Sequence, residues 1–391
     1  MGMTKRVLIL SFYFAPDLCA GSFRTNALIE SLEPLAFAKN VQIDVVTTMP
    51  NRYANFHVDA PTSEIKGCVT IHRIKIPSHQ SGFVDQAKSF THYFFKSLQI
   101  TKHKDYDVVY ATSSRLFTAF LGTRIATKKH VPLFLDIRDI FTDTMQAILK
   151  FPLNTLLPVF NFIERYTIKK ANALNVVSEG FVSYFKSRTS CEISTISHGI
   201  DTCFKDLQCS HSEIRSINRV LYAGNIGQGQ GIEKIIPPLA EKFKNHCEFY
   251  IIGSGGQLKA LKEACKNLNN VHILLPMDRQ ELIQHYQDCD ILFLHLNDLP
   301  AFNKVLPSKI FEYVMTGKPI LAGLSGYSAE FLNQHVSGSW VFSPCNIDQA
   351  GEQLQAILEN GIEIKDREEF YKQFSREKSM RELSLKIMSY I

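Results

Sequence analysis

A run of residues suited to binding a phosphate lies at 304–319, toward the carboxyl end of the chain. Ser308 is a good N-cap for a helix over Lys309–Met315, and the first N–H groups of a helix attract anions. Lys304 and Lys309 can add charge-assisted hydrogen bonds to the same anion. The spacing therefore predicts a phosphate site at the start of this helix.

A carboxylate stands on the same face of the predicted helix. Glu312 follows Ser308 by four residues, which places the two side chains on one side of the helix. Carboxylate oxygens accept hydrogen bonds, so Glu312 can hold the two hydroxyls of a ribose. The alternative is a solvated helix residue, and the apolar neighbours of Glu312 argue against full exposure.

A glycine-rich loop precedes a predicted helix that starts at Ile232. It follows a predicted strand at 219–223 and contains Gly224, Asn225, Gly227, Gly229, Gln230 and Gly231. Glycines let backbone N–H groups approach a ligand closely, and the helix start attracts anions. We interpret the loop as a diphosphate cradle, with a plain flexible loop as the alternative. It does not match GxxxxGK[ST], so a P-loop ATPase is not supported.

A second glycine turn, Gly253–Gly256, also follows a predicted strand. It lacks the third glycine of a dinucleotide-binding fingerprint, and no acidic residue ends the next strand at 271–274. A tight turn and a ligand contact remain equally open here.

Two carboxylates flank an arginine at the carboxyl end of a buried strand at 132–136. These residues are Asp136, Arg138 and Asp139. Such a group at the end of a strand indicates an active site rather than a core. An ion pair between Arg138 and either carboxylate is the structural alternative.

The elements that must position these residues form two series. Short apolar runs alternate with amphipathic stretches, which predicts parallel sheets with crossover helices. The first series has strands at 6–11, 41–48, 69–76, 107–111, 132–136, 173–177 and 193–197, and a helix at 22–35. The second has strands at 219–223, 248–252, 271–274, 290–294 and 319–322, and helices at 232–243, 257–266 and 280–286. A polar stretch at 206–218 is interpreted as the linker between two α/β domains.

The composition is that of a globular protein, with 45% apolar and 21% charged residues among 391. A net charge of +5 is too small for a dedicated nucleic-acid binder and suits phosphate-bearing ligands or an anionic membrane. Nine scattered cysteines without a CxxC pair predict free thiols in a reducing cytoplasm. We expect neither a signal peptide nor a membrane-spanning segment, because no apolar stretch has the required length.

Two segments, 88–98 and 153–170, mix apolar and basic residues as an interfacial helix does. Core packing of crossover helices explains the same pattern, and from the residues alone we favour it.

The motifs of the second half resemble the donor-binding half of retaining glycosyltransferases of the GT-B fold, glycosyltransferase family 4. The resemblance rests on the strand with its glycine-rich loop, the GxG turn and E-x-x-x-x-G-x-P at 312–319. The segments 224–230 and 306–313 are similar to the bacterial branch that includes fucosamine (L-FucNAc) transferases of polysaccharide synthesis. The resemblance covers nearly the whole chain.

The resemblance implies that Glu312 binds the donor ribose. We assign donor contacts also to the loop residues Gly224, Asn225, Gly227 and Gln230 and to the segment Leu306, Pro307, Ser308 and Lys309. The family commonly has a second glutamate where this chain has Lys304, and Arg and Lys where it has Asn225 and Gln230. We expect Lys304, as a catalytic candidate, and Lys309 to stabilise the leaving diphosphate in place of a metal cation.

In the first half, the resemblance implies that Gly21 lies against the donor phosphate. Arg24, in the first turn of a helix, and Arg138 are candidates for binding an acceptor or a phosphate. A surface salt bridge is the alternative for Arg24. Resembling transferases carry D-x-R-D over the acceptor side, so we nominate Asp139 for orienting or deprotonating the acceptor hydroxyl. His198, in a hinge motif, is expected to be structural.

We therefore expect an α/β protein of the GT-B fold, with two facing Rossmann-like domains and a central cleft. The acceptor domain is placed at 1–200, the nucleotide-sugar domain at 219–365, and helices at 366–391 are expected to cross back. The expected reaction moves a sugar, first guess L-FucNAc, from a UDP-sugar to a polyprenyl-diphosphate-linked oligosaccharide in O-antigen or capsule synthesis. It would retain anomeric configuration and need no metal, cofactor or nucleic acid. We expect the protein in the cytoplasm or on the inner face of the cytoplasmic membrane, where polyprenyl-linked acceptors would lie.

Three alternatives stay open: a nucleotide-sugar 2-epimerase of the same fold, an NAD-dependent oxidoreductase and a non-catalytic nucleotide-binding scaffold.

Overall fold

The computed structural model describes residues 4–51, 59–77, 83–113, 116–149, 151–205, 207 and 217–391, without the side chains of residues 83 and 84. The chain divides into two compact units. The first contains residues 1–198 and 376–391, and the second contains residues 199–375. Most of the linker predicted at 206–218 lies outside the described residues.

The first unit is built on an eight-stranded sheet in the order β3-β4-β2-β1-β5-β6-β7-β8. Its strands are β1 Lys5–Leu10, β2 Val41–Thr48, β3 Ser63–Lys66, β4 Val69–Ile74, β5 Val108–Thr112, β6 Leu133–Ile137, β7 Ala173–Val176 and β8 Glu192–Thr195. All neighbours are parallel except β3 and β4. The central strands are apolar and buried because helices cover both faces.

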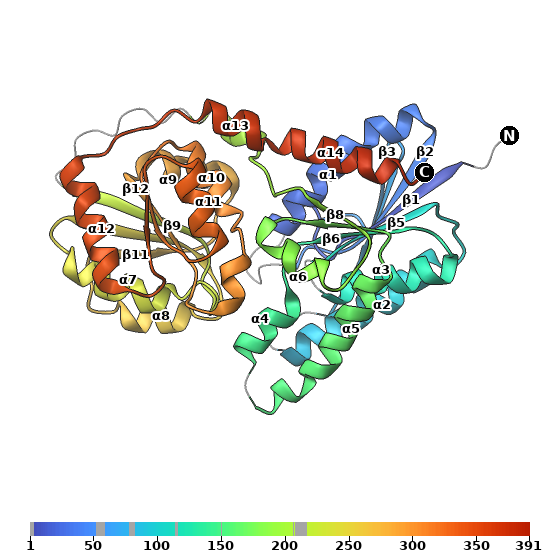
Figure 1. Ribbon diagram of the computed structural model, residues 1–391, viewed down its shortest axis with the longest axis horizontal. Coiled ribbons are helices and arrows are strands. Elements are labelled where there is room, and N and C mark those ends of the chain that lie inside the picture. The colour runs from blue at the N-terminus through green and yellow to red at the C-terminus, as the bar shows by residue number, and fades with distance from the viewer. Residues whose placement is uncertain are drawn as a thin grey trace. The chain divides into compact units, whose positions relative to one another are not determined.

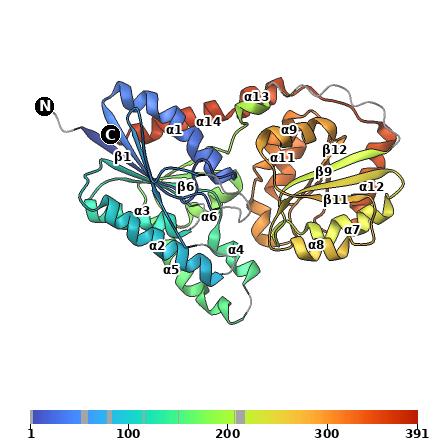
Figure 2. The same cartoon turned by 180° about the vertical axis from the view of Figure 1, so that it is seen from behind.

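The helices of the first unit form two layers (Figures 1 and 2). On one face lie α1 Ala20–Ala38 and α14 Arg376–Met388, which pack together. On the other face α3 Leu116–Lys129 lies between α2 Phe83–Thr101 and α5 Leu157–Lys169. The remaining helices are α4 Phe141–Ile148 and α6 Val182–Lys186, with 3₁₀ turns at Leu153–Leu156, Glu179–Phe181 and, already in the second unit, Thr202–Phe204.

The second unit has a six-stranded parallel sheet in the order β11-β10-β9-β12-β13-β14. Its strands are β9 Asn218–Asn225, β10 Cys247–Ser254, β11 Val271–Leu274, β12 Ile291–His295, β13 Ile320–Gly323 and β14 Ser339–Phe342. One face packs against α7 Ile232–Lys242, α8 Leu258–Ala264 and α12 Ile347–Asn360. The other packs against α9 Arg279–Asp288, α10 Lys309–Met315, α11 Tyr327–His335 and α13 Glu368–Phe374.

The predicted α/β class and the strand–helix alternation are confirmed in both units. Strands β3 and β14 were not expected. Three of the four residues of β3 are exposed, and β14 has only one buried residue. Edge strands of this kind lack the apolar run that reveals a central strand.

The order of the strands reverses between β1 and β5 in the first sheet and between β9 and β12 in the second. At such a reversal, the loops after the carboxyl ends of the two strands run in opposite directions. The crevice between these loops is where ligands bind in sheets of this kind. The loop after β1 precedes Gly21, and the glycine-rich loop follows β9. No helix among the described residues is long and apolar enough to cross a membrane.

Candidate active site

Lys309 lies directly beside the glycine-rich loop. A Cβ placed on Gly224, whose φ is +149°, would collide with the Lys309 side chain. The Lys309 Nζ atom lies 4.9 Å from the centre of the Tyr222 ring and 3.4 Å from the Tyr222 hydroxyl. Burial lowers the pKa of Lys309 to about 8, although Glu312 opposes this shift. The structure thus brings the two predicted phosphate motifs together around one desolvated cation.

The glycine-rich loop is held by its own polar side chains. The Asn225 Nδ2 atom donates to the Gln230 Oε1 atom at 2.8 Å, and the Tyr222 hydroxyl donates to the Asn225 carbonyl oxygen at 2.6 Å. A Cβ on Gly227 would meet both amides. These bonds give the loop a defined shape, unlike the plain flexible loop that was the alternative.

His295, at the end of β12, holds the glycine-rich loop by a hydrogen bond. Its role was not predicted. Its Nδ1 atom lies 2.6 Å from the Gln230 carbonyl oxygen, and its Nε2 atom accepts the Cys345 N–H at 2.9 Å. Only the neutral tautomer with the proton on Nδ1 satisfies both bonds. Burial lowers the pKa of His295 to about 4, so the ring is neutral at physiological pH.

Asn297 holds the same loop at two points and also contacts α7. Its N–H donates to the Gly229 carbonyl oxygen at 2.8 Å, and its Nδ2 atom donates to the Gln228 carbonyl oxygen at 2.9 Å. Its Oδ1 atom accepts from Lys234 Nζ at 3.0 Å. The sequence signal for both residues was two polar side chains at the carboxyl end of a buried strand.

The second glycine turn serves close packing of backbone against backbone. A Cβ on Gly253 would strike the Gly224 carbonyl group, and one on Gly255 would strike that of Ile226. Ile226 also exchanges backbone hydrogen bonds of 2.9 Å with Ser254 and Gln257. Of the two interpretations left open, the structure supports the tight turn.

Glu312 is anchored rather than solvated. The Tyr286 hydroxyl donates to its Oε2 atom at 3.1 Å, and Arg279 Nη2 lies 3.7 Å from its Oε1 atom. Arg279 in turn pairs with Asp201 at 2.8 Å. Each carboxylate oxygen has a second lone pair, so the carboxylate remains able to accept hydroxyl protons from a ligand.

The segment before α10 differs from its prediction in two respects. Ser308 occupies the N-cap position, but its side chain makes no capping bond. The N–H groups of Ile310 and Phe311 donate to the carbonyl oxygens of Pro307 and Ser308 at 3.1 and 3.2 Å. These two N–H groups therefore already have hydrogen-bond partners. Of the groups predicted to bind phosphate at α10, the structure places Lys309 beside the glycine-rich loop.

Leu306 is 4% exposed and packs in the core of the second unit. Its side chain therefore does not make the contact with the donor that the sequence predicted. Lys304 ends the 3₁₀ turn Pro300–Lys304 and is partly buried. Its catalytic role stays a prediction.

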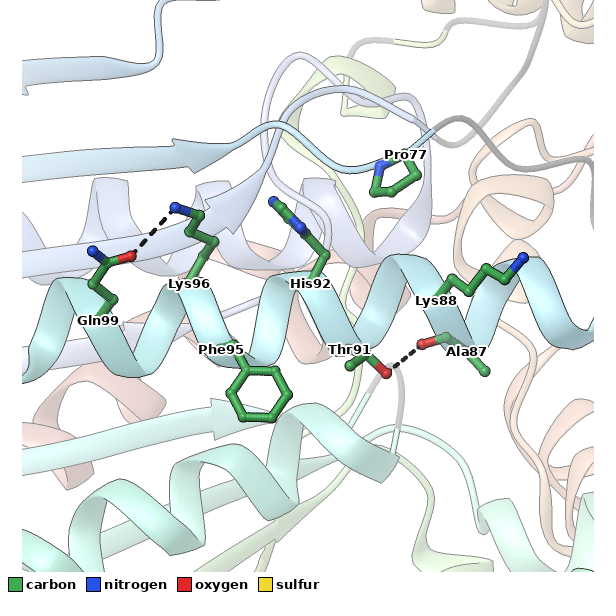
Figure 3. Close-up of a pocket in the computed structure, with 8 residues that line it drawn as sticks. All are labelled: Pro77, Ala87, Lys88, Thr91, His92, Phe95, Lys96 and Gln99. Carbon is green, nitrogen blue, oxygen red and sulfur yellow. Dashed lines mark hydrogen bonds between the residues drawn. The ribbon is translucent and has the colours of Figure 1, made fainter.

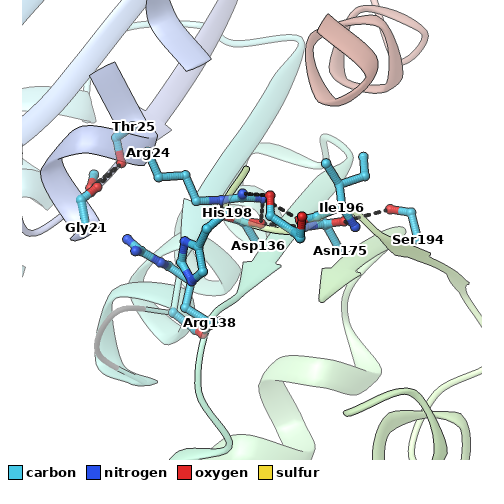
Figure 4. Close-up of polar contacts among 12 residues, drawn as sticks. Gly21, Arg24, Thr25, Asp136, Arg138, Asn175, Ser194, Ile196 and His198 are labelled. Carbon is cyan, nitrogen blue, oxygen red and sulfur yellow. Dashed lines mark hydrogen bonds and ion pairs between the residues drawn. The ribbon is translucent and has the colours of Figure 1, made fainter. Parts of the chain in front are cut away.

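Arg24 does not serve as the predicted ligand for a phosphate or acceptor. It is 1% exposed, and its Nε and Nη2 atoms donate to both Asp136 oxygens at 2.8 and 2.9 Å. It also donates to the carbonyl oxygens of Ser197 and Ile196 at 2.6 and 3.0 Å (Figure 4). Opposite charge on Asp136 keeps the pKa of Arg24 raised despite burial. The surface salt bridge that was the alternative is in fact a buried one.

Arg138 is buried without making the ion pair that was its structural alternative. Among the described residues, neither its Nε atom nor its Nη1 atom has a hydrogen-bond partner. The side chain extends toward Gly21 and lies next to His198 (Figure 4). Burial and the nearby arginines hold the pKa of His198 well below its usual range, so this ring is neutral.

Asp139 follows Arg138, and part of its side chain is exposed to solvent. The protein around the carboxyl displaces water and raises its pKa to about 6, while Arg138 opposes the rise. An exposed carboxylate with a pKa near 6 is suited to accept a proton at neutral pH.

A surface hollow of about 570 Å³ lies along α2 (Figure 3). It is lined by Pro77, Ala87, Lys88, Thr91, His92, Phe95, Lys96 and Gln99. None of the predicted site residues is among these described lining residues, so the hollow is separate from the candidate site.

Comparison with known proteins agrees with this geometry. Residues 211–377 match the family model of glycosyl transferases group 1. No curated protein matches the chain.

Solved structures of similar fold cover almost the whole chain. Sucrose-phosphate synthase from Thermosynechococcus elongatus has a TM-score of 0.67 at 13% identity, over 98% of this chain and 94% of that one. The lipopolysaccharide glycosyltransferase WaaG has 0.63 at 15%, over 97% and 95%. HepE from Anabaena, in complex with UDP, has 0.60 at 14%, over 99% and 97%.

These likenesses show a fold shared by GT-B glycosyltransferases. Together with the matched domain, which contains the glycine-rich loop, Lys309 and Glu312, they give the class of the enzyme. The chain therefore has the GT-B fold and is a glycosyltransferase, and its residues 211–377 match the model of glycosyl transferases group 1.

Proposed function

We propose that this enzyme transfers a sugar from a UDP-sugar to a hydroxyl group of a lipid-linked oligosaccharide, with retention of anomeric configuration. The observation that carries the donor part is the placement of Lys309 against Gly224, with Glu312 one helical turn further along α10. A cation beside a glycine-rich loop suits a diphosphate, and an anchored carboxylate suits a ribose. UDP, present in the HepE complex, has both groups.

The chemistry proposed for the donor side needs no metal ion. As the sugar–phosphate bond breaks, negative charge grows on the leaving diphosphate. Lys309 and the backbone N–H groups of the loop would stabilise that charge, and Lys304 is a further candidate. Asp139 would orient the acceptor hydroxyl or take its proton.

The proposal extends to the sugar and to the acceptor. L-FucNAc and a role in O-antigen or capsule synthesis come from the sequence resemblance alone. A lipid-linked acceptor is supported by an exposed apolar stripe on the first unit, formed by Phe151, Leu153, Leu156, Val159 and Phe162. The exposed residues Arg165, Lys169 and Lys170 continue it along α5, which suits an anionic membrane surface.

Calorimetric titration with UDP, GDP and NAD in EDTA tests the donor part. We expect UDP alone to bind, and Glu312→Ala to weaken it about tenfold or more because hydrogen bonds to a carboxylate are lost. Glu330→Ala, which alters an exposed glutamate in the first turn of α11, is the matched control. Preference for GDP would contradict a UDP-sugar donor, and loss of UDP binding in EDTA would contradict metal independence.

Sedimentation with lipid vesicles tests the membrane part. We expect binding to phosphatidylglycerol vesicles and weaker binding to phosphatidylcholine vesicles. The double variant Val159→Ser/Phe162→Ser should lose most of the binding. Phe37, also exposed but at the end of α1, provides the control Phe37→Ser. Equal loss in the control would show that the stripe has no special role.

A further inference from the structure

Glu312 is contacted by two residues of one helix, both in its own unit. Arg279 is the first residue of α9, and Tyr286 follows it by seven positions. Seven residues make about two helical turns, so both side chains leave α9 on the same side. The Tyr286 hydroxyl donates to the Glu312 Oε2 atom at 3.1 Å, and the Arg279 Nη2 atom lies 3.7 Å from the Oε1 atom. The carboxylate is thus held by a hydroxyl at one oxygen and faces a guanidinium at the other.

The contact between Glu312 and Arg279 is not a fully formed ion pair. Its 3.7 Å separation is longer than a hydrogen bond, in which nitrogen and oxygen lie about 2.7–3.2 Å apart. Arg279 makes its close contact with Asp201, whose Oδ2 atom lies 2.8 Å from the Arg279 Nη1 atom. The three charged side chains are only 20–24% exposed, and attraction between partly buried charges is stronger than in water. Glu312 therefore has a cation within reach with which it does not pair closely.

Tyr286 is firmly placed. It is 1% exposed, and its ring centre lies 5.6 Å from that of Tyr313 and 6.0 Å from that of Phe204. Its carbonyl oxygen accepts from the Nζ atom of the fully buried Lys318 at 3.0 Å. Burial and the neighbouring Glu312 carboxylate raise the pKa of Tyr286 well above its usual value, so the hydroxyl keeps the proton that it donates. The group that binds Glu312 Oε2 is therefore held by packing and by its own backbone.

Closer pairing with Arg279 would make Glu312 unavailable to a ligand. Recognition of a ribose needs carboxylate oxygens that accept two hydroxyl protons. A guanidinium can pair with a carboxylate through two parallel hydrogen bonds, which engage both oxygens. Arg24 and Asp136 form such a pair in the first unit. Something must prevent the same arrangement between Arg279 and Glu312.

We propose that Tyr286 and Asp201 are positioning residues of the donor site, which keep the Glu312 carboxylate from pairing with Arg279 and leave it open to the ribose hydroxyls. Tyr286 holds one carboxylate oxygen by its hydrogen bond, and Asp201 supplies the close counter-charge of Arg279. The inference rests on the proposed function, because it takes Glu312 to be the ligand of the donor ribose. It makes Tyr286 and Asp201 determinants of specificity for ribose nucleotides.

Calorimetry with two ligands tests the effect on the ribose. UDP has both ribose hydroxyls and 2′,3′-dideoxy-UDP has neither, so the ratio of their affinities isolates the contacts with these hydroxyls. We expect the wild type to prefer UDP. Tyr286→Phe and Asp201→Asn should each lose about tenfold of this preference, with the affinity for 2′,3′-dideoxy-UDP unchanged.

Two matched control variants lie elsewhere in the second unit. Tyr250→Phe alters a partly buried tyrosine of β10, and Asp348→Asn alters an exposed carboxylate in the first turn of α12. Both should keep the preference of the wild type for UDP.

A rescue separates positioning from general support of the fold. Adding Arg279→Met to Tyr286→Phe removes the cation that would pair with Glu312, so the double variant should regain most of the preference for UDP. If Tyr286 only supported the fold, both ligands would bind more weakly and the second substitution would restore nothing.

A double-mutant cycle in urea tests the same contact without a ligand. The stabilities of Arg279→Met, Glu312→Gln and their combination give the coupling between the two side chains. The same substitutions are then made together with Tyr286→Phe. We expect a larger coupling there, because the carboxylate is released toward the guanidinium.

Failure of this inference differs from failure of the proposed function. If Tyr286→Phe prefers UDP as the wild type does while Glu312→Ala loses the preference, the ribose role of Glu312 stands and the positioning role is overturned. A coupling in urea that is no larger in Tyr286→Phe overturns it as well. If the wild type binds the two ligands equally, the ribose role fails and the positioning role with it. If the wild type binds no UDP, the UDP-sugar proposal fails, and the coupling in urea still decides whether Tyr286 keeps Glu312 and Arg279 apart.

Discussion

Arg24 holds both oxygens of the Asp136 carboxylate, with its Nε and Nη2 atoms at 2.8 and 2.9 Å. The two residues are 112 positions apart in the sequence and both are buried. The pair joins α1 to the end of β6, and through Ser197 and Ile196 it also holds the chain after β8. A buried ion pair of this kind is valuable only while it is complete, because either partner alone is a desolvated charge.

Asp136→Asn should therefore destabilise the protein strongly. It leaves Arg24 without a counter-charge, and breaking a buried pair typically costs about 3–5 kcal/mol in the free energy of unfolding. Urea denaturation followed by circular dichroism measures the loss. The double variant Arg24→Met/Asp136→Leu removes both charges and should recover most of it. A single variant as stable as the wild type would show that the pair contributes little.

Donor binding should depend on pH through Lys309. The pKa of this partly buried amine is about 8 in the free protein, and its cationic form attracts a diphosphate. UDP affinity should therefore fall as the pH rises above about 8. Lys309→Met should bind UDP about tenfold more weakly at pH 7 and lose this dependence. Lys262→Met, at an exposed position of α8, should behave as the wild type does. A pH slope that survives in Lys309→Met would assign the titration to another group.

Turnover should depend on Asp139. A carboxylate that accepts the acceptor proton must be ionised, and its pKa of about 6 places the loss of turnover below pH 6. Asp139→Asn should lower kcat about 100-fold, and the turnover that remains should no longer fall below pH 6. Its affinity for UDP should be unchanged. Asp105→Asn, at an exposed carboxylate of the same unit, is the control. Full turnover in Asp139→Asn would refute the assignment.

Acid should weaken the second unit through His295. The pKa of this residue is lowered to about 4 in the folded state from its usual 6.5, so the unfolded state binds more protons between these values. The contribution of neutral His295 to the free energy of unfolding is thus fully present above pH 6.5 and is lost as the pH falls toward 4. Urea midpoints at pH 7, 5.5 and 4.5 should decline in the wild type and decline less in His295→Gln. Parallel declines in both proteins would contradict this role.

The sequence predicted most of the elements because parallel strands covered on both faces are continuous apolar runs. The bounds of β2, β11 and α10 agree with those expected. Periodicity was uninformative for β3, which is polar and lies at the edge of the sheet.

Site residues within one motif were easier to anticipate than their distant partners. Lys309 and Glu312 stand on one helix, so their spacing alone relates them to each other. His295 lies 65 residues from Gln230, and nothing local to either residue reveals that they are bonded. Arg24 was misjudged for the same reason. A first-turn arginine looks like an anion ligand until the carboxylate opposite it is known.

The packing of α14 against α1 makes the second unit an insertion in the first. The chain leaves the first unit after His198 and re-enters it at Arg376, and Met380, Leu383, Ile387 and Met388 then complete an apolar core that contains β1 and β2. During synthesis on the ribosome, the unit that begins first must therefore finish last. The second unit can close as soon as its own residues emerge, while the earlier-made sheet waits with one face of α1 uncovered. A fragment that stops near residue 198 should consequently aggregate, whereas a fragment spanning 199–375 should fold by itself.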